Sequence, residues 1–227
     1  MNKNNFSKNC DLSCYTTIKV GGIAEYFAEP RNIDEFSKLI KWANLNKQKC
    51  QIIGAGSNLL INNVFIKGLV ICTKKMKTLT ISPHSGIVEA EAGVMLPTLS
   101  NYLAKNGLQG GEWAVGIPGT LGGAIYMNAG TGNLSLAKNL ISVKVIDNKT
   151  QEKIEIERKD INFKYRFSSF QSNNLAIISA KLYFEPNGNH EKLIETTKNN
   201  LRLKTEKQPY HLPSFGSVFK NPENNYA

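Results

Sequence analysis

The sequence predicts an α+β fold, and three of its features support this prediction. Short runs of β-branched and apolar residues recur along the 227 residues, separated by amphipathic segments with helical period. These two kinds of segment are interleaved, but they do not follow the strict strand–helix alternation of a doubly wound parallel sheet. The apolar fraction of 41% is that of a globular domain, so a packed core is expected rather than a disordered chain.

The N-terminal half contains predicted helices at both ends and predicted strands between them. Apolar residues at helical spacing predict a helix over residues 32–46, which Asn32 or Asp34 can cap, and another over residues 95–106. Short apolar runs between these helices predict strands at residues 51–53, 68–73 and 87–92.

The C-terminal half continues the same pattern. Residues 120–127 are expected to form a short helical turn, and residues 190–205 a longer helix that ends in a basic run. The Asn- and Gly-rich turn at residues 186–189 is the predicted domain boundary, which separates residues 1–186 from a smaller part, residues 187–227. The strands expected in this half are residues 141–146, 153–156 and 175–184.

The chain is basic, with 28 Lys and Arg against 18 Asp and Glu and a formal net charge of +10. Such a surplus suits nucleic acid, an anionic membrane surface or phosphorylated small molecules. The lysines are scattered and aromatic residues are not interleaved with them, which disfavours a nucleic-acid-binding module. The polar N-terminus lacks the apolar core of a signal peptide, and no apolar run approaches a membrane span. We therefore expect a soluble, cytoplasmic protein without nucleic-acid or membrane partners.

The sequence shows no metal-binding pattern. No C-x-x-C pair occurs, the three histidines are dispersed, and no His or Cys pair completes a zinc set. Reduced thiols are expected at Cys10, Cys14, Cys50 and Cys72.

A first glycine turn, Gly54-Ala55-Gly56-Ser57-Asn58, follows a predicted strand. A dinucleotide fingerprint of the G-x-G-x-x-G type needs a third glycine and a following helix. Leu59 stands at the third glycine position, and Leu59-Leu60-Ile61 has the pattern of a strand, so this fingerprint is rejected. A tight turn with Ser and Asn still offers backbone N–H groups to a pyrophosphate, although such a turn taken alone is more often structural.

A second glycine-rich stretch, GIPGTLGGAIYMNAG, occupies residues 116–130. Pro118 fixes φ in its first turn, and the helical turn expected from Thr120 would direct its N-terminal amides at an anion. Two glycine turns on one chain fit a ligand with an extended diphosphate.

Five motifs in series over nearly the whole chain together resemble the UDP-N-acetylenolpyruvoylglucosamine reductase (MurB) family of flavin enzymes. They are TTIKVGG at 16–22, GAGSNLL at 54–60, GIPGTLGGAIYMNAG at 116–130, YRFS at 165–168 and GSVFKNP at 216–222. Each motif is weak alone, and the series makes the signature specific. The resemblance implies a two-part FAD-binding domain of the vanillyl-alcohol-oxidase (PCMH) type over residues 1–186, and an incomplete substrate-binding domain over residues 187–227.

The resemblance also implies that the two glycine turns wrap the diphosphate of non-covalently bound FAD, with Thr17 and Gly21-Gly22 at the edge of the site. Larger side chains at these glycines would hold the backbone amides away from the cofactor. We expect Gly56→Val or Gly119→Val to abolish flavin binding with little loss of folding. The cofactor-binding residues implied are Gly54, Ala55, Gly56, Ser57, Asn58, Gly116, Gly119, Thr120, Gly122 and Gly123.

The family's reaction is the NADPH-driven reduction of UDP-N-acetyl-3-O-(1-carboxyvinyl)glucosamine to UDP-N-acetylmuramate, for peptidoglycan synthesis, cell-wall formation and cell division. Arg166 matches the family's arginine, whose planar guanidinium suits the substrate carboxylate. Ser217 matches the family's proton donor, although a serine hydroxyl needs hydrogen-bonded support from neighbours such as Lys220 or Asn221. FAD is the implied cofactor, and NADPH and a UDP-sugar are the implied small-molecule partners.

The family also uses a glutamate well beyond the motif at residues 216–222. The sequence ends at Ala227, and Glu223 lies in the wrong context to replace that glutamate, so we expect a chain truncated within its substrate-binding domain. Two alternatives stay open: a flavin-binding remnant without turnover, and another oxidoreductase of the same FAD superfamily. The motifs at residues 165–168 and 216–222 argue against the second alternative.

Three further polar residues are candidates for contacts with flavin or uridine: Tyr126, Asn128 and Tyr210. Trp113, between a glycine pair and the turn that begins at Gly116, is expected to pack in the core.

Overall fold

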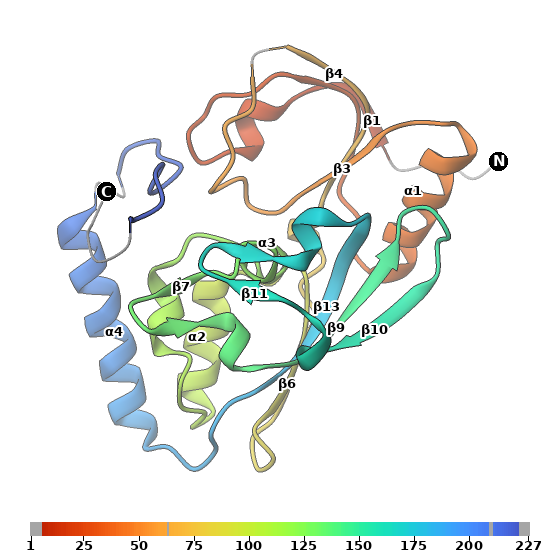
Figure 1. Cartoon of the computed structure of the whole chain (residues 1–227). Coiled ribbons are helices and arrows are strands. Elements are labelled where there is room, and N and C mark those ends of the chain that lie inside the picture. Colours follow the sequence, from red (N-terminus) through yellow and green to blue (C-terminus); the bar gives the residue numbers. More distant parts are fainter. Residues whose placement is uncertain (1–5, 63, 209–210, 223–227) are drawn as a thin grey trace.

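The computed structural model describes residues 6–62, 64–208 and 211–222, and it contains two larger sheets (Figure 1). The first sheet has the strand order β1-β2-β4-β3. β1 is antiparallel to β2, whereas β2, β4 and β3 run parallel to one another. The bounds of these strands are β1 Phe6–Asp11, β2 Ile23–Ala28, β3 Cys50–Ile53 and β4 Phe65–Cys72.

The second sheet is antiparallel throughout, with the order β10-β9-β13-β6-β5. Two short hairpins, β7–β8 and β11–β12, extend beside it. The bounds are β5 Leu79–Ser82, β6 Ile87–Glu91, β9 Leu140–Asp147, β10 Lys153–Glu157 and β13 Leu175–Tyr183, with β7 Gly130–Thr131, β8 Leu134–Ser135, β11 Phe163–Lys164 and β12 Phe167–Ser168.

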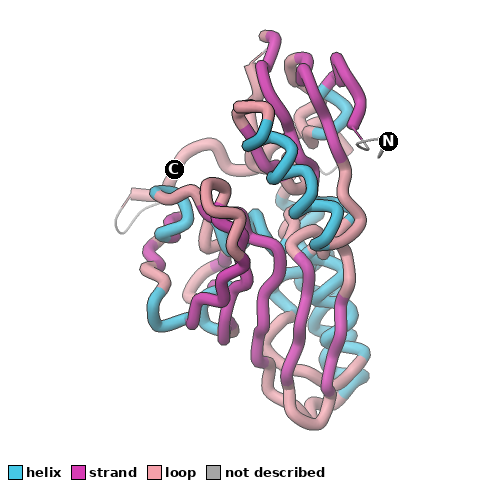
Figure 2. The backbone as a smooth tube through the Cα atoms, turned by 90° about the vertical axis from the view of Figure 1, so that its right-hand side faces the viewer, coloured by secondary structure: helices cyan, strands magenta, loops and turns pink. Residues whose placement is uncertain are grey.

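Helix α1 (Ile33–Leu45) joins the two sheets through one core cluster. It begins where predicted, because the Asn32 side chain accepts a hydrogen bond from the Glu35 backbone N–H at 2.9 Å. Its buried face packs with residues of β4 and also with Ile146 of β9 and Ile178 of β13. Figure 2 shows the two sheets one above the other, with a helix between them. The sheets therefore share apolar packing rather than forming independent layers.

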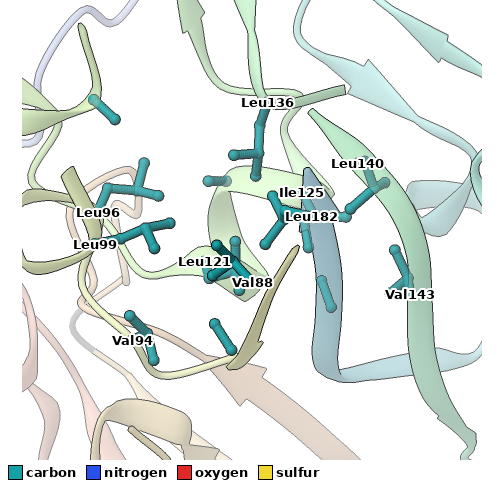
Figure 3. Packing of buried hydrophobic residues seen from close by; sticks show 14 of the residues in the cluster. Val88, Val94, Leu96, Leu99, Leu121, Ile125, Leu136, Leu140, Val143 and Leu182 are labelled. Carbon is teal, nitrogen blue, oxygen red and sulfur yellow. The ribbon is translucent and has the colours of Figure 1, made fainter. Parts of the chain in front are cut away.

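The largest core cluster lies between the second sheet and helices α2 (Leu96–Lys105) and α3 (Leu121–Tyr126), as Figure 3 shows. Trp113 is 7% exposed within this cluster, and its indole N–H donates to the Gly110 carbonyl at 3.0 Å. The predicted core position of this tryptophan is confirmed.

Helix α4 (His190–Lys207) packs along α2 and the 3₁₀ turn η3 (Glu112–Gly116) at one side of the molecule (Figure 1). Its buried positions are Leu193 and Thr197, one helical turn apart. The helix follows directly on the predicted domain boundary and contacts the preceding part of the chain.

The predicted helices and most predicted strands are present, and the α+β class is confirmed. Leu59-Leu60-Ile61 was expected to be a strand and is irregular instead, since β4 begins only at Phe65. The predictions also missed β1, which is mostly polar, and the short strands β2 and β5, all of which are fixed by pairing with neighbouring strands. In the described ranges, no helix combines the length and apolar character that a membrane crossing requires.

Candidate functional site

Three segments that are far apart in the sequence meet at one place, next to the start of α3. Gly54 lies so close to Thr120 that a Cβ at residue 54 would overlap Thr120 Oγ1. A Cβ at Gly119 would have Ser57 Oγ as its nearest neighbour, at 3.5 Å. A Cβ at Gly216 would lie 4.0 Å from the Ser57 carbonyl oxygen. The structure therefore brings the two glycine turns together and adds the C-terminal motif to them.

The first glycine turn presents backbone N–H groups that no acceptor in the described residues occupies. The backbone N–H groups of residues 55–58 have no hydrogen-bond acceptor within the described part of the chain. Gly56 has φ +64°, and a Cβ there would overlap the Tyr15 carbonyl oxygen, so glycine is required by both conformation and space. Consecutive unpaired N–H groups in a tight turn form an anion-binding nest. The turn therefore fits a diphosphate, and FAD is a cofactor that carries one.

The second glycine segment differs, because most of the N–H groups at the start of its helix already donate to acceptors within the protein. The N–H of Leu121 donates to the Val94 carbonyl at 2.8 Å, and the N–H of Gly122 donates to the Ala92 carbonyl at 2.8 Å. The N–H of Gly123 donates to Thr120 Oγ1 at 3.4 Å. Pairing of residues 92–96 with residues 119–122 thus takes up the Leu121 and Gly122 donors, whereas the Thr120 N–H has no acceptor in the described residues. The expectation that this helix start directs its amides at an anion therefore stays a prediction for Thr120 alone.

The glycines of the second segment serve two purposes. Gly116 makes room for the Lys204 side chain of α4, and Gly122 packs against Ala92, where a Cβ would come within 2.9 Å of the alanine Cβ. Gly119 and Gly123 have more space, because in both cases the nearest heavy atom to an added Cβ is a hydroxyl oxygen at 3.5 Å. Protein packing therefore explains the first pair, whereas the second pair has open space, which at Gly119 lies beside Ser57 of the first glycine turn.

Arg166 lies on the turn between β11 and β12, with φ +52°. Its Nη2 donates to the Gly130 carbonyl at 3.0 Å, and its guanidinium stacks over the Tyr165 ring, 4.9 Å from the centroid. The Gln171 side-chain amide donates to the carbonyls of Tyr126 at 2.8 Å and Arg166 at 3.3 Å. The β11–β12 hairpin that carries Arg166, here called the arginine hairpin, is thus hydrogen-bonded to the C-terminal end of the second glycine segment, where α3 ends.

Ser217 lies on a segment that bridges the two parts of the site. The Ser214 N–H donates to the Thr17 carbonyl at 3.1 Å, and the Asn221 N–H donates to Tyr165 Oη at 3.4 Å. Ser217 itself is exposed, and its hydroxyl has no hydrogen-bond partner among the residues that the structure describes. The expected support from Lys220 or Asn221 is therefore not present at this hydroxyl.

Two further candidate residues, Asn128 and Tyr126, lie beside the arginine hairpin. Asn128 has φ +45°, and its Nδ2 donates to the Lys164 carbonyl at 2.9 Å, whereas its buried Oδ1 has no partner in the described residues. Tyr126 is 42% exposed at the end of α3. Tyr210 lies outside the described residues. Asn128 and Tyr126 stay candidates for ligand contact.

Two titratable groups beside the first glycine turn, the Tyr15 hydroxyl and the Cys72 thiol, stay protonated at neutral pH. Burial, and then the nearby Glu29 carboxylate, raise the pKa of Tyr15 to about 12. Burial also raises the pKa of the Cys72 thiol above its ordinary value. All four cysteines are free thiols. Over the described ranges, no three or more His, Cys, Asp or Glu side chains gather where they could hold a metal ion.

The fold and the glycine turns define a flavin-binding class of protein. Residues 24–153 match the family described as "FAD binding domain". A solved structure of Phl p 4, described as a glucose oxidase, superimposes with a TM-score of 0.61 at 13% identity, covering 82% of this chain and 42% of that one. At that identity the likeness shows the fold alone, which is the FAD-binding fold of the PCMH type.

Closer relatives give the family. The chain is 72% identical to UDP-N-acetylenolpyruvoylglucosamine reductase of Prochlorococcus marinus subsp. pastoris, over 98% of this chain and 75% of that protein. It superimposes on the crystal structure of UDP-N-acetylenolpyruvylglucosamine reductase (MurB) from Thermus caldophilus with a TM-score of 0.78, at 28% identity, covering 98% of this chain and 76% of that one. The chain belongs to the UDP-N-acetylenolpyruvoylglucosamine reductase family.

Proposed function

We propose that this chain binds FAD and takes part in the NADPH-driven reduction of UDP-N-acetyl-3-O-(1-carboxyvinyl)glucosamine to UDP-N-acetylmuramate, a step of peptidoglycan synthesis in the cytoplasm. The observation that carries the proposal is the first glycine turn, whose N–H groups at residues 55–58 have no acceptor in the described chain and lie opposite Gly119. Membership of the family supports the substrate and the reaction.

FAD, when bound, supplies hydride transfer between NADPH and the enolpyruvyl group. The chain's own residues bind and orient the groups around it. Ala55, Gly56, Ser57 and Asn58 hold the diphosphate through their N–H groups, and Gly119 leaves space for it. Gly54 and Thr120 form the close contact that keeps the two segments together.

Arg166 is proposed to hold the substrate carboxylate. In the described chain its guanidinium uses the Nη2 donor on Gly130, which leaves its other N–H groups for a planar carboxylate. Negative charge that develops beside this carboxylate during the reduction is stabilised by a fixed cation. The stacking on Tyr165 keeps the guanidinium plane in place.

Ser217 is proposed to deliver a proton to the substrate carbon. The proposal is supported by the two contacts of the segment that carries Ser217, which is held to the Thr17 carbonyl through the Ser214 N–H and to Tyr165 Oη through the Asn221 N–H. General acid catalysis of this kind contributes about 10²- to 10⁴-fold to a rate.

A second function, flavin binding without turnover, is favoured by one observation. The Ser217 hydroxyl has no hydrogen-bond partner in the described residues, and an unsupported serine is a weak acid. Under this alternative the chain binds and reduces flavin but leaves the enolpyruvyl sugar unchanged.

Two measurements test these proposals. The purified protein is expected to show flavin absorbance, and denaturation is expected to release free FAD. NADPH oxidation is then measured with and without the enolpyruvyl sugar. Turnover that depends on the sugar and falls about 100-fold or more in Ser217→Ala supports the reductase. Flavin reduction without sugar turnover supports the second function, and a protein that takes up no FAD contradicts both.

The division of the chain is also a proposal. Residues 1–186 form the FAD-binding domain, and residues 187–227 lead into the substrate-binding domain. Helix α4, in the second part, packs against α2 and η3, which belong to the first part.

A further inference from the structure

The carbonyl groups of the first glycine turn are held by residues from outside the turn. The Cys72 thiol, at the end of β4, donates to the Gly54 carbonyl with 3.5 Å between sulfur and oxygen. The Gly56 carbonyl accepts from the Thr17 backbone N–H at 3.3 Å and from Thr17 Oγ1 at 3.4 Å. Two alternate carbonyls of the turn are therefore fixed, one from the sheet and one from the segment before β2.

Fixing a carbonyl also fixes the next amide. A trans peptide unit is planar, with its C=O and N–H pointing in opposite directions, and every peptide bond of the described chain is trans. The direction of the Gly54 carbonyl therefore sets that of the Ala55 N–H, and the Gly56 carbonyl sets that of the Ser57 N–H. These two N–H groups are among those without an acceptor in the described residues. Each thus points away from an anchored carbonyl.

Cys72 is suited to this task by its surroundings. It is 0% exposed, so its S–H has no access to water as an alternative partner. Burial raises the pKa of its thiol, which keeps the sulfur protonated and able to donate at neutral pH. A buried cysteine usually acts as a small apolar residue, and its directed hydrogen bond at a ligand-binding turn goes beyond packing.

We propose that Cys72 and Thr17 are positioning residues that hold the Gly54 and Gly56 peptide planes so that the Ala55 and Ser57 N–H groups face the diphosphate of FAD. This inference rests on the proposed flavin function and identifies which residues outside the turn determine its affinity. In this arrangement each residue acts through a carbonyl of the turn.

A matched pair of variants separates positioning from packing. Cys72→Ser replaces the thiol with a hydroxyl that can still donate to the Gly54 carbonyl, and it reduces the side-chain volume. Cys72→Val fills the volume and removes the donor. Positioning predicts that Cys72→Val raises the FAD dissociation constant about 5-fold, the usual scale for one hydrogen bond, whereas Cys72→Ser stays within about 2-fold of the parent. Packing alone predicts the reverse order, because serine leaves a buried polar atom in a smaller side chain.

Two further variants complete the test. Cys50→Val, in the neighbouring strand β3, serves as the control because Cys50 makes no hydrogen bond to the turn in the described chain. It is expected to leave FAD affinity unchanged. Thr17→Val removes Oγ1 but keeps the backbone N–H, so an increase of about 2-fold in the dissociation constant is expected. FAD affinities are measured by fluorescence titration of the FAD-free protein.

The anchors also have a readout that does not need flavin. In FAD-free protein, NMR relaxation dispersion at the Ala55 and Ser57 amides is expected to show little exchange for the parent and Cys72→Ser, and clear exchange for Cys72→Val. A parent protein without FAD affinity overturns the proposed function, and with it the diphosphate assignment. FAD binding that is equal in Cys72→Ser and Cys72→Val, with unchanged relaxation, overturns the positioning role while the flavin function stands.

Discussion

The two glycine segments of the site look alike in sequence and differ in what they offer a ligand. The first turn, residues 54–58, has a glycine locked at φ +64° and N–H groups without acceptors in the described chain. In the second segment, residues 116–130, the Leu121 and Gly122 N–H groups at the helix start donate to the carbonyls of Val94 and Ala92. Its Gly119 instead faces open space beside Ser57. The first segment supplies hydrogen-bond donors and the second supplies room, so a glycine's role is set by its neighbours in space.

The largest expected effect is that of Gly56→Val. A β-branched residue at φ +64° is strained, and its Cβ would overlap the Tyr15 carbonyl oxygen. We expect a loss of about 1–3 kcal/mol in the free energy of unfolding together with the loss of FAD binding. Urea unfolding followed by circular dichroism measures the first, and fluorescence titration the second. This corrects the expectation from the sequence that the fold would be spared; a fully stable variant would show that Tyr15 and its turn can move aside.

Gly119→Val is expected to abolish FAD binding and to leave the fold intact. The nearest heavy atom to an added Cβ is Ser57 Oγ, at 3.5 Å, so the valine can be placed without backbone overlap and would occupy the space proposed for the cofactor. An increase of about 100-fold or more in the dissociation constant corresponds to about 2.7 kcal/mol. The melting temperature of the FAD-free variant should match that of the FAD-free parent. Normal FAD affinity in this variant would place the diphosphate elsewhere.

The segments of this site could be predicted from the sequence, but not which of them offers hydrogen-bond donors and which offers space to a ligand. Periodicity located α1 with its Asn32 cap, and the motif series brought together segments that do meet in space. Whether the N–H groups at the start of α3 are open to a ligand depends on the pairing of Met95 with Thr120, which joins two distant segments and which no local pattern reveals. The Cys72 anchor was missed for the same reason, since an apolar strand residue carries no sign that its thiol reaches the turn.

Thr120→Ala is expected to have an intermediate effect. Its Oγ1 accepts from the Gly123 N–H at 3.4 Å and lies against Gly54. Loss of an N-cap hydroxyl costs about 1 kcal/mol in the free energy of unfolding. FAD affinity should change less than in Gly119→Val, because the donors proposed for the diphosphate belong to the other segment. Thr120→Ser, which keeps the hydroxyl, is the matched control and should restore stability; equal losses in both variants would assign the effect to the methyl group.

The smallest expected effect has the opposite sign. Gly123 is exposed near the start of α3, and an added Cβ there meets no atom closer than 3.5 Å. Replacing a helical glycine with alanine stabilises a protein by about 0.4–1 kcal/mol, so Gly123→Ala should raise the melting temperature of FAD-free protein. Thermal unfolding followed by circular dichroism measures this gain. A gain in stability accompanied by weaker FAD binding would show that the cofactor passes close to this helix turn, whereas a loss of stability would contradict the open space described at Gly123.

The most direct test of the difference between the two segments is a titration of ¹⁵N-labelled, FAD-free protein with FAD, followed by amide NMR. We expect large downfield shifts of the N–H protons of Ala55, Gly56, Ser57 and Asn58, because a phosphate oxygen replaces water as their acceptor. Small shifts are expected for Leu121 and Gly122, whose N–H groups already donate to protein carbonyls. Large shifts at Leu121 and Gly122, with the amides of residues 55–58 unchanged, would contradict the proposed difference between the two segments.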